Sequence, residues 1–100
     1  MKTTFRENGK ELIMEFEGRL DTAAAPQTEK DVEVLSDCMG HDIVLDCSKL
    51  EYISSSGLRI FLGIVKNAKP KGSRVYISGL SEELQKVFAM TGFTSLFDYK

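Results

Sequence analysis

The sequence is poor in the residues from which many catalytic and metal sites are built. It has one histidine, His41, and two cysteines, Cys38 and Cys47, among 100 residues. Two cysteines are too few for a disulfide framework, and they lack the spacing of a metal-ligand set. We interpret both as reduced, small apolar residues of a helix and a strand. His41 lies between two predicted elements and is best interpreted as a solvated loop residue, so neither a zinc site nor a Ser-His-Asp triad is expected.

The sequence also lacks an excess of positive charge and a long apolar run. A formal net charge of −2 gives no surplus of cations to contact phosphates, which argues against direct binding of nucleic acid. No apolar run approaches the ~20 residues of a membrane span. The first eight residues lack the apolar core of a signal peptide. We therefore expect a cytoplasmic protein that does not insert into a membrane.

The length and composition favour one globular domain over residues 1–100. The sequence is 42% hydrophobic and 28% charged, which is an ordinary globular balance. It contains no internal repeat, low-complexity stretch or linker. A domain of this size can bury roughly 60–70% of the surface that its unfolded chain exposes, which is enough for one modest core.

The first twenty residues predict a β-hairpin. Residues 3–7 and 11–17 have the character of strands. In the second, one face carries Leu12, Met14 and Phe16, and the other carries Glu11, Ile13, Glu15 and Glu17. Asn8-Gly9 between them is the strongest short hairpin signal, because both central residues of a type I′ turn need a positive φ.

A helix is predicted over about 25–39, with Pro26 in the first turn, where proline is tolerated. Gly40 is a plausible end for this helix. The apolar stripe that should face the core consists of Thr28, Val32, Leu35 and Met39.

The remaining sequence alternates strands and helices. A strand is predicted over 42–47, and its apolar centre indicates that it is covered on much of its surface. A short loop from Ser48 to Ser54 should lead to a helix over about 56–68, which is apolar enough to be buried on more than half of its circumference. A turn at 70–72 precedes another strand over 75–77.

The last part of the sequence predicts a third helix with clear signals at both ends. Ser81 can cap it, and Glu82 and Glu83 are favourably placed in its first turn. Gly92 should end it, and residues 94–99 can add an edge strand. The order β-β-α-β-α-β-α, with a further β, predicts an α/β (α+β mixed) fold with a mixed four- to five-stranded sheet and helical crossovers.

The most informative segment is Ser54-Ser55-Ser56-Gly57, at the start of the second predicted helix. The first backbone N–H groups of a helix have no internal partner, and the helix dipole places about half a positive charge there. A phosphate on one of the serines would be accommodated at this position. From the residues alone, simple N-capping by a serine is the favoured interpretation over a regulatory phosphoserine. A nucleophilic serine is disfavoured because no base is available.

This segment resembles the signature of the STAS domain, a family named for sulfate transporters and anti-sigma factor antagonists. The family pattern is an apolar strand, then D-x-S-x-L-x-x-I/M-D-S-S-G-L/V, then a helix. The residues that match it are Asp46, Ser48, Leu50, Ile53, Ser55, Ser56, Gly57 and Leu58. Residues 18–21 also resemble the family's G-x-L-D motif, and residues 78–93 resemble its closing helix. The resemblance therefore covers nearly the whole chain and implies a mixed sheet with helices mainly on one face.

The resemblance also implies a phosphorylation site. In antagonists of this family, the serine directly after the acid of D-S-S-G is phosphorylated, which is Ser55 here, with Ser54 and Ser56 as alternates. Ser54 stands where the family has the acid, so a negative charge is lost and a second possible phosphoacceptor is gained. Asp21 matches the family acid near the switch serine, although the residues alone favour a cap for the following loop or helix.

The resemblance finally implies a bacterial regulatory protein that is not an enzyme and needs no cofactor. Without phosphate, it would dock onto an anti-sigma factor that is also a serine kinase of the histidine-kinase-like ATPase fold. That kinase, with its own ATP and magnesium, would release it by phosphorylation, and a serine phosphatase would reset it. The alternative is a non-switching STAS module serving as a cytosolic subunit of a membrane transporter or signalling complex. The expected partner-binding residues are Asp21, Thr22, Ser54, Ser55, Ser56, Gly57 and Arg59.

Overall fold

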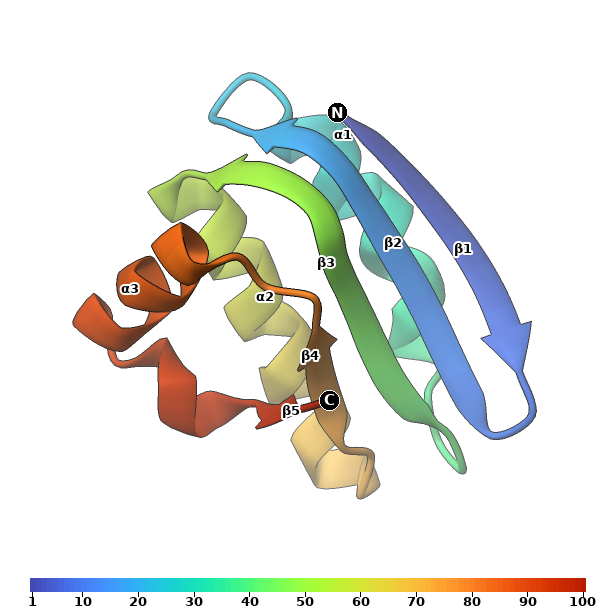
Figure 1. Ribbon diagram of the computed structural model, residues 1–100. Helices are drawn as coiled ribbons and strands as arrows, with labels where there is room; N and C mark the ends of the chain where they lie inside the picture. The colour runs from blue at the N-terminus through green and yellow to red at the C-terminus, as the bar shows by residue number, and fades with distance from the viewer.

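The computed structural model describes residues 1–100 and contains a five-stranded mixed sheet, as the sequence predicts (Figure 1). The strands follow one another across the sheet in chain order. The first pair is antiparallel, and the other three pairs are parallel. The strands are β1 Lys2–Asn8, β2 Glu11–Leu20, β3 Asp42–Ile53, β4 Val75–Ser78 and β5 Asp98–Tyr99.

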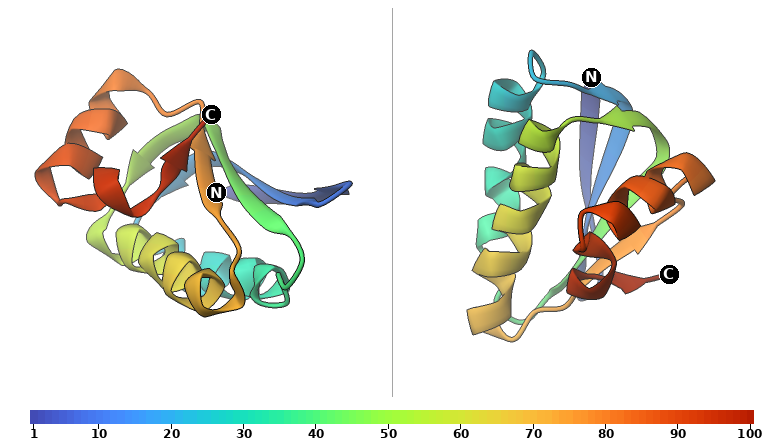
Figure 2. Two further views of the ribbon diagram at one scale, coloured as in Figure 1. Left: turned by 90° about the horizontal axis from the view of Figure 1, so that it is seen from below. Right: turned by 90° about the vertical axis from the view of Figure 1, so that its left-hand side faces the viewer.

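Helices α1 and α2 lie side by side across one face of the sheet (Figure 2). The α-helices are α1 Ala25–Asp31, α2 Ser55–Ala68 and α3 Glu82–Met90. Three short 3-10 helices, η1 Val32–Ser36, η2 Lys69–Lys71 and η3 Phe93–Leu96, complete the structure. None of the helices combines the length and the apolar character that crossing a membrane requires.

The core lies between the sheet and the helices, and Phe61 of α2 is at its centre. Its ring centroid is 5.0 Å from that of Phe16 on β2, 6.2 Å from that of Phe88 on α3 and 6.4 Å from that of Phe97. Phe16, Phe61 and Phe88 are completely buried. One aromatic side chain of α2 therefore joins the sheet, the third helix and the approach to β5.

The opposite face of the sheet carries no helix, yet Ile13 of β2 and Val44 of β3 are buried there as neighbours in register. Charged side chains cover this strip. Glu15 forms ion pairs with Arg6, at 3.6 Å, and with Lys49, at 3.2 Å. Long side chains with apolar stems can shield apolar surface while their charges remain in water.

Strand β1 forms one edge of the sheet, and every residue in it except Thr3 is exposed. It carries the charged residues Lys2, Arg6 and Glu7. The hairpin that joins it to β2 differs from the prediction. Its central residues are Gly9 and Lys10, and only Gly9 has a positive φ, of 61°. The predicted type I′ turn at Asn8-Gly9 is therefore wrong, and one positive φ at the first central position is the pattern of a type II′ turn.

The predicted helix over 25–39 is shorter than expected, although Pro26 does lie in its first turn. After Asp31 the chain tightens into η1, which ends at Ser36. A 3-10 helix has three residues per turn, so its buried residues Val32 and Leu35 are three positions apart. Cys38, after the end of η1, is also buried. Met39, predicted to face the core, is 69% exposed, and Gly40 lies in the turn before β3.

Strand β3 is twice as long as predicted, because residues 48–53 continue the strand instead of forming a loop. Its pairing with β2 shifts register between Glu15 and Glu17 and again between Gly18 and Arg19. Such β-bulges interrupt the alternation from which a strand is recognised in sequence. The extension brings β3 to the start of α2 without an intervening loop.

The predictions for α2, β4 and α3 are confirmed with small shifts. The edge strand predicted over 94–99 is mostly wrong, because residues 93–96 form η3 and only Asp98–Tyr99 pair with β4. Helix α2 begins one residue before the predicted 56 and ends at the predicted 68. The backbone N–H of Leu84 donates to Ser81 Oγ at 3.2 Å, so Ser81 caps α3. Both cysteines are buried and free. Burial, with a smaller contribution from Asp46, raises the pKa of the Cys47 thiol to about 12, so this thiol stays protonated and unreactive at neutral pH.

Candidate functional site

The segments that carry the predicted site meet at one end of the sheet, where the parallel strands β2 and β3 finish (Figure 1). Leu20 and Ile53 are opposite each other in register. The backbone N–H of Ser54 donates to the carbonyl of Leu20 at 2.8 Å. Asp21 and Ser55, which follow these two residues, therefore belong to adjacent segments at the same end of the molecule.

Ser54 is the cap of α2. Its hydroxyl oxygen accepts from the backbone N–H of Gly57 at 3.2 Å, and its carbonyl accepts from that of Leu58 at 2.9 Å. The residue is only 8% exposed. Its hydroxyl is thus occupied in holding the first turn of the helix.

Ser55 and Ser56 are the first two residues of α2. Ser55 is exposed and Ser56 is half-buried. No acidic residue lies in this first turn, so the partial positive charge of the helix end has no neighbouring carboxylate of its own helix. Ser55 therefore presents an accessible hydroxyl at a position that favours added negative charge.

Gly57 is buried beneath these serines. A Cβ at this position would lie 2.7 Å from Leu20 Cγ and 2.8 Å from Ile53 Cγ1, closer than non-bonded carbon atoms can approach. The absent side chain allows the first turn of α2 to pack directly on the ends of β2 and β3. Ser54 and Gly57 are therefore buried residues that hold the start of α2 in place. The sequence prediction grouped them with the exposed residues as partner-binding.

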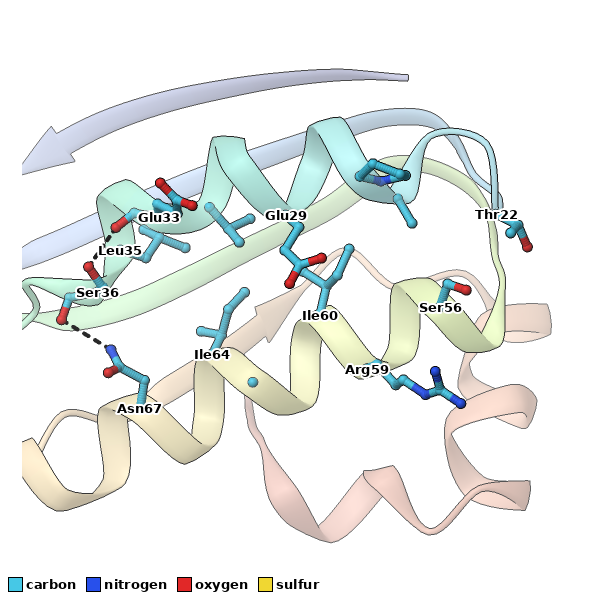
Figure 3. A pocket seen from close by; sticks show the side chains of 14 residues that line it. Thr22, Glu29, Glu33, Leu35, Ser36, Ser56, Arg59, Ile60, Ile64 and Asn67 are labelled. Carbon is cyan, nitrogen blue, oxygen red and sulfur yellow. Dashed lines mark hydrogen bonds between the residues drawn. The ribbon is translucent and has the colours of Figure 1, made fainter.

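Asp21 is half-buried and organises the turn that leads to α1. Its Oδ1 accepts from the backbone N–H of Ala24 at 2.9 Å, and its carbonyl accepts from that of Ala25 at 3.1 Å. Thr22 and Arg59 are exposed. In Figure 3, Thr22, Ser56 and Arg59 lie together at the N-terminal end of α2. We call the accessible set Asp21, Thr22, Ser55, Ser56 and Arg59 the serine surface.

Sequence reasoning missed Arg19 and Tyr52, which lie opposite each other just before the serine surface. The Arg19 guanidinium is 4.5 Å from the centre of the Tyr52 ring, and Tyr52 is 40% exposed. Tyrosine and arginine are frequent in the energetically dominant parts of protein interfaces. Their pairing depends on the extension of β3, which the sequence predicts as a loop.

Ser54→Ala should lower the free energy of unfolding by about 1–2 kcal/mol, because it removes the N-cap acceptor and leaves the buried N–H of Gly57 without a partner. Ser54→Asp is the matched control, since aspartate caps helices as well as serine does and should retain most of the stability. Urea unfolding followed by circular dichroism measures both. Equal stability of Ser54→Ala and the unmodified chain would contradict the capping role.

The sequence pattern of the STAS domain matches residues 2–100, and the chain therefore belongs to the STAS domain family. An anti-sigma-B factor antagonist of Listeria monocytogenes is 29% identical over 83 residues, covering 83% of this chain and 73% of the relative. BtrV of Bordetella bronchiseptica is 32% identical over 97 residues, covering 97% of this chain and 84% of BtrV. Both matches therefore cover most of the domain described above.

Solved structures of the Bacillus protein SpoIIAA, an anti-sigma factor antagonist, share the fold. Its unphosphorylated form has a TM-score of 0.72 at 19% identity, covering 89% of this chain and 83% of SpoIIAA. Its phosphorylated form has a TM-score of 0.74 at 18% identity, covering 99% of this chain and 91% of SpoIIAA. The two forms therefore match the fold of this chain about equally well.

Proposed function

We propose that this chain is an anti-sigma factor antagonist that docks through the serine surface while Ser55 is unmodified and is released when Ser55 is phosphorylated. The observation that carries the proposal is the exposed Ser55 hydroxyl at the first position of α2, beside the segment of Asp21. The anti-sigma-B factor antagonists among its relatives support the class of partner. The partner would be an anti-sigma factor with serine kinase activity, and a serine phosphatase would restore the docking form.

Electrostatics explains why one phosphate on Ser55 would end docking. It adds about −1.5 to −2 charges to a surface that already carries Asp21. Placing that charge in an interface costs several kcal/mol of desolvation, and a few kcal/mol corresponds to about 10²-fold or more in affinity. The positive end of α2 favours the same phosphate, so the domain should stay folded. The near-equal fit of both SpoIIAA forms to this fold is in keeping with a change confined to the surface.

Accessibility distinguishes the three serines as phosphoacceptors. A kinase must reach the hydroxyl and place it in line with the phosphate of ATP. The hydroxyl of Ser54 is buried and accepts from Gly57, and Ser56 is half-buried. Ser55 is the exposed member of the three, and we assign it as the phosphorylated residue.

Ser55→Ala should abolish ATP-dependent phosphorylation by the kinase partner while retaining docking. The measurement is intact mass of the purified chain after incubation with the purified anti-sigma kinase of its host, where phosphorylation adds about 80 Da. Ser56→Ala is the matched control and should gain the phosphate as the unmodified chain does. Phosphorylation of Ser55→Ala would move the site to another residue. Docking without any phosphorylation would instead favour a non-switching STAS module.

A further inference from the structure

A groove of about 620 Å³ lies between α1 and η1 on one side and α2 on the other (Figure 3). Apolar side chains of both walls, among them Val32, Ile60 and Ile64, lie along its base. The groove is closed at one end, where Asn67 Nδ2 donates to the Ser36 carbonyl at 3.0 Å. Lys71 Nζ also donates to this carbonyl and to Asn67 Oδ1.

The other end of the groove reaches the serine surface. Thr22, Ser56 and Arg59 belong both to that surface and to the lining of the groove. A segment entering the groove would therefore come from a molecule already in contact with the serine surface. The groove is thus a continuation of the proposed docking site along the length of α2.

Gly63 lines the groove in the middle of α2, and neither the backbone conformation nor the packing of this chain requires a glycine there. Its φ is not left-handed, and a Cβ built on it would meet no atom within 4 Å. Glycine inside a helix is less stable than alanine, because its backbone loses more freedom on folding. The domain alone would therefore be more stable with alanine. Close approach of another molecule to the α2 backbone would account for the glycine.

The α1 side of the groove is acidic. Glu29 and Glu33 line it, and neither carboxylate takes part in an ion pair of this chain. Both residues are exposed. A lysine or arginine of an incoming segment would therefore find two unpaired carboxylates on the α1 side of the groove.

We infer that this groove receives a segment of the anti-sigma partner, with an apolar side chain packed against Gly63 and a cationic side chain directed to Glu29 and Glu33. The inference rests on the proposed function and extends its docking surface beyond the serines. The groove is open to solvent between the two helices (Figure 3). Small-molecule pockets, in contrast, usually enclose most of their ligand. A chain segment of a partner is the occupant that fits this shape.

Gly63→Ala should change stability and affinity in opposite directions. The melting temperature should rise by about 4 °C, because alanine favours the helix and its methyl group meets no atom of this chain. Affinity for the purified anti-sigma kinase should fall about tenfold, because the methyl group occupies the space of the inserted side chain. Gly63→Leu should lower the affinity by about a hundredfold. Calorimetry measures both quantities on the same samples.

Two further variants separate the groove from general effects on α2. Lys66→Ala places alanine on an exposed position of the same helix outside the groove lining, and its affinity should equal that of the unmodified chain. Glu29→Gln combined with Glu33→Gln should weaken binding about tenfold at low salt and less at high salt, because the lost attraction is electrostatic.

The outcomes distinguish the groove from the serine surface. Suppose that Gly63→Ala and Gly63→Leu both bind with full affinity, while Ser55→Asp, tested separately in the same assay, loses binding. This result would overturn the inference about the groove and leave the proposed function intact. Failure of the unmodified chain to bind any anti-sigma kinase of its host would overturn both. Protection of α1 and α2 backbone amides from hydrogen exchange on addition of the kinase would support the groove, and protection confined to the first turn of α2 would count against it.

Discussion

Ser55→Asp should weaken binding of the anti-sigma partner by about a hundredfold while the melting temperature changes by no more than about 2 °C. The added carboxylate lies on the serine surface, where a docked partner would have to desolvate it beside Asp21. At the same position it faces the positive end of α2, which favours an anion and offsets the cost of crowding charges. Isothermal titration calorimetry and thermal unfolding of the same preparation test both halves of this expectation.

Ser81→Asp is the matched control for this substitution. Ser81 is an exposed serine at the start of another helix, α3, and aspartate there keeps the cap while adding the same charge. Its partner affinity should remain that of the unmodified chain. Comparable losses in both variants would mean that net charge, and not the place of the charge, controls binding. Normal binding by Ser55→Asp would contradict the proposed switch.

Phe61→Ala should lower the free energy of unfolding by about 4 kcal/mol, the largest effect on stability that we expect from any single substitution in this chain. The side chain is completely buried, and its ring lies against those of Phe16, Phe88 and Phe97. Truncating a buried phenylalanine typically costs 3–5 kcal/mol, out of a total stability of about 5–15 kcal/mol. Urea unfolding monitored by circular dichroism measures the loss.

Two other phenylalanine variants test whether the position at the centre of the core is what matters. Phe61→Leu keeps an apolar side chain and should lose about 1–2 kcal/mol. Phe93→Ala removes a half-buried ring at the margin of the same cluster and should cost about half as much as Phe61→Ala. If the loss at Phe93 equalled that at Phe61, the cluster would have no single centre.

Much of the fold could be predicted because its strongest signals are local. The apolar residues of α2 and the Ser81 cap of α3 each determine structure within one or two helical turns. The second half of β3 could not be predicted, since its bulged pairing with β2 breaks the alternation that marks a strand. Met39 was misassigned to the core because the helix does not reach it: η1 ends at Ser36, and the chain leaves the helical conformation at Asp37, so Met39 is exposed.

The sequence was sufficient to locate the candidate site, but not to assign a function to each of its residues. Sequence places three serines at the start of α2, and only the structure shows that Ser54 is the buried cap while Ser55 is exposed. The function of Gly57 depends on two side chains from different strands, Leu20 and Ile53, whose proximity no local pattern contains. The groove beside Gly63 is likewise invisible in sequence, because it arises from the spacing between two packed helices.

The charged edge strand β1 has a consequence for how such a regulator would behave in a crowded cell. The free backbone groups of an edge strand can recruit another sheet, and oligomers or fibres grow in this way. Lys2, Arg6 and Glu7 make that encounter unfavourable, because a second sheet would have to strip water from them. For a regulator that acts by docking onto a partner, as we propose, a protected edge at β1 would keep copies from associating through this strand, so that more of them remain available to the partner.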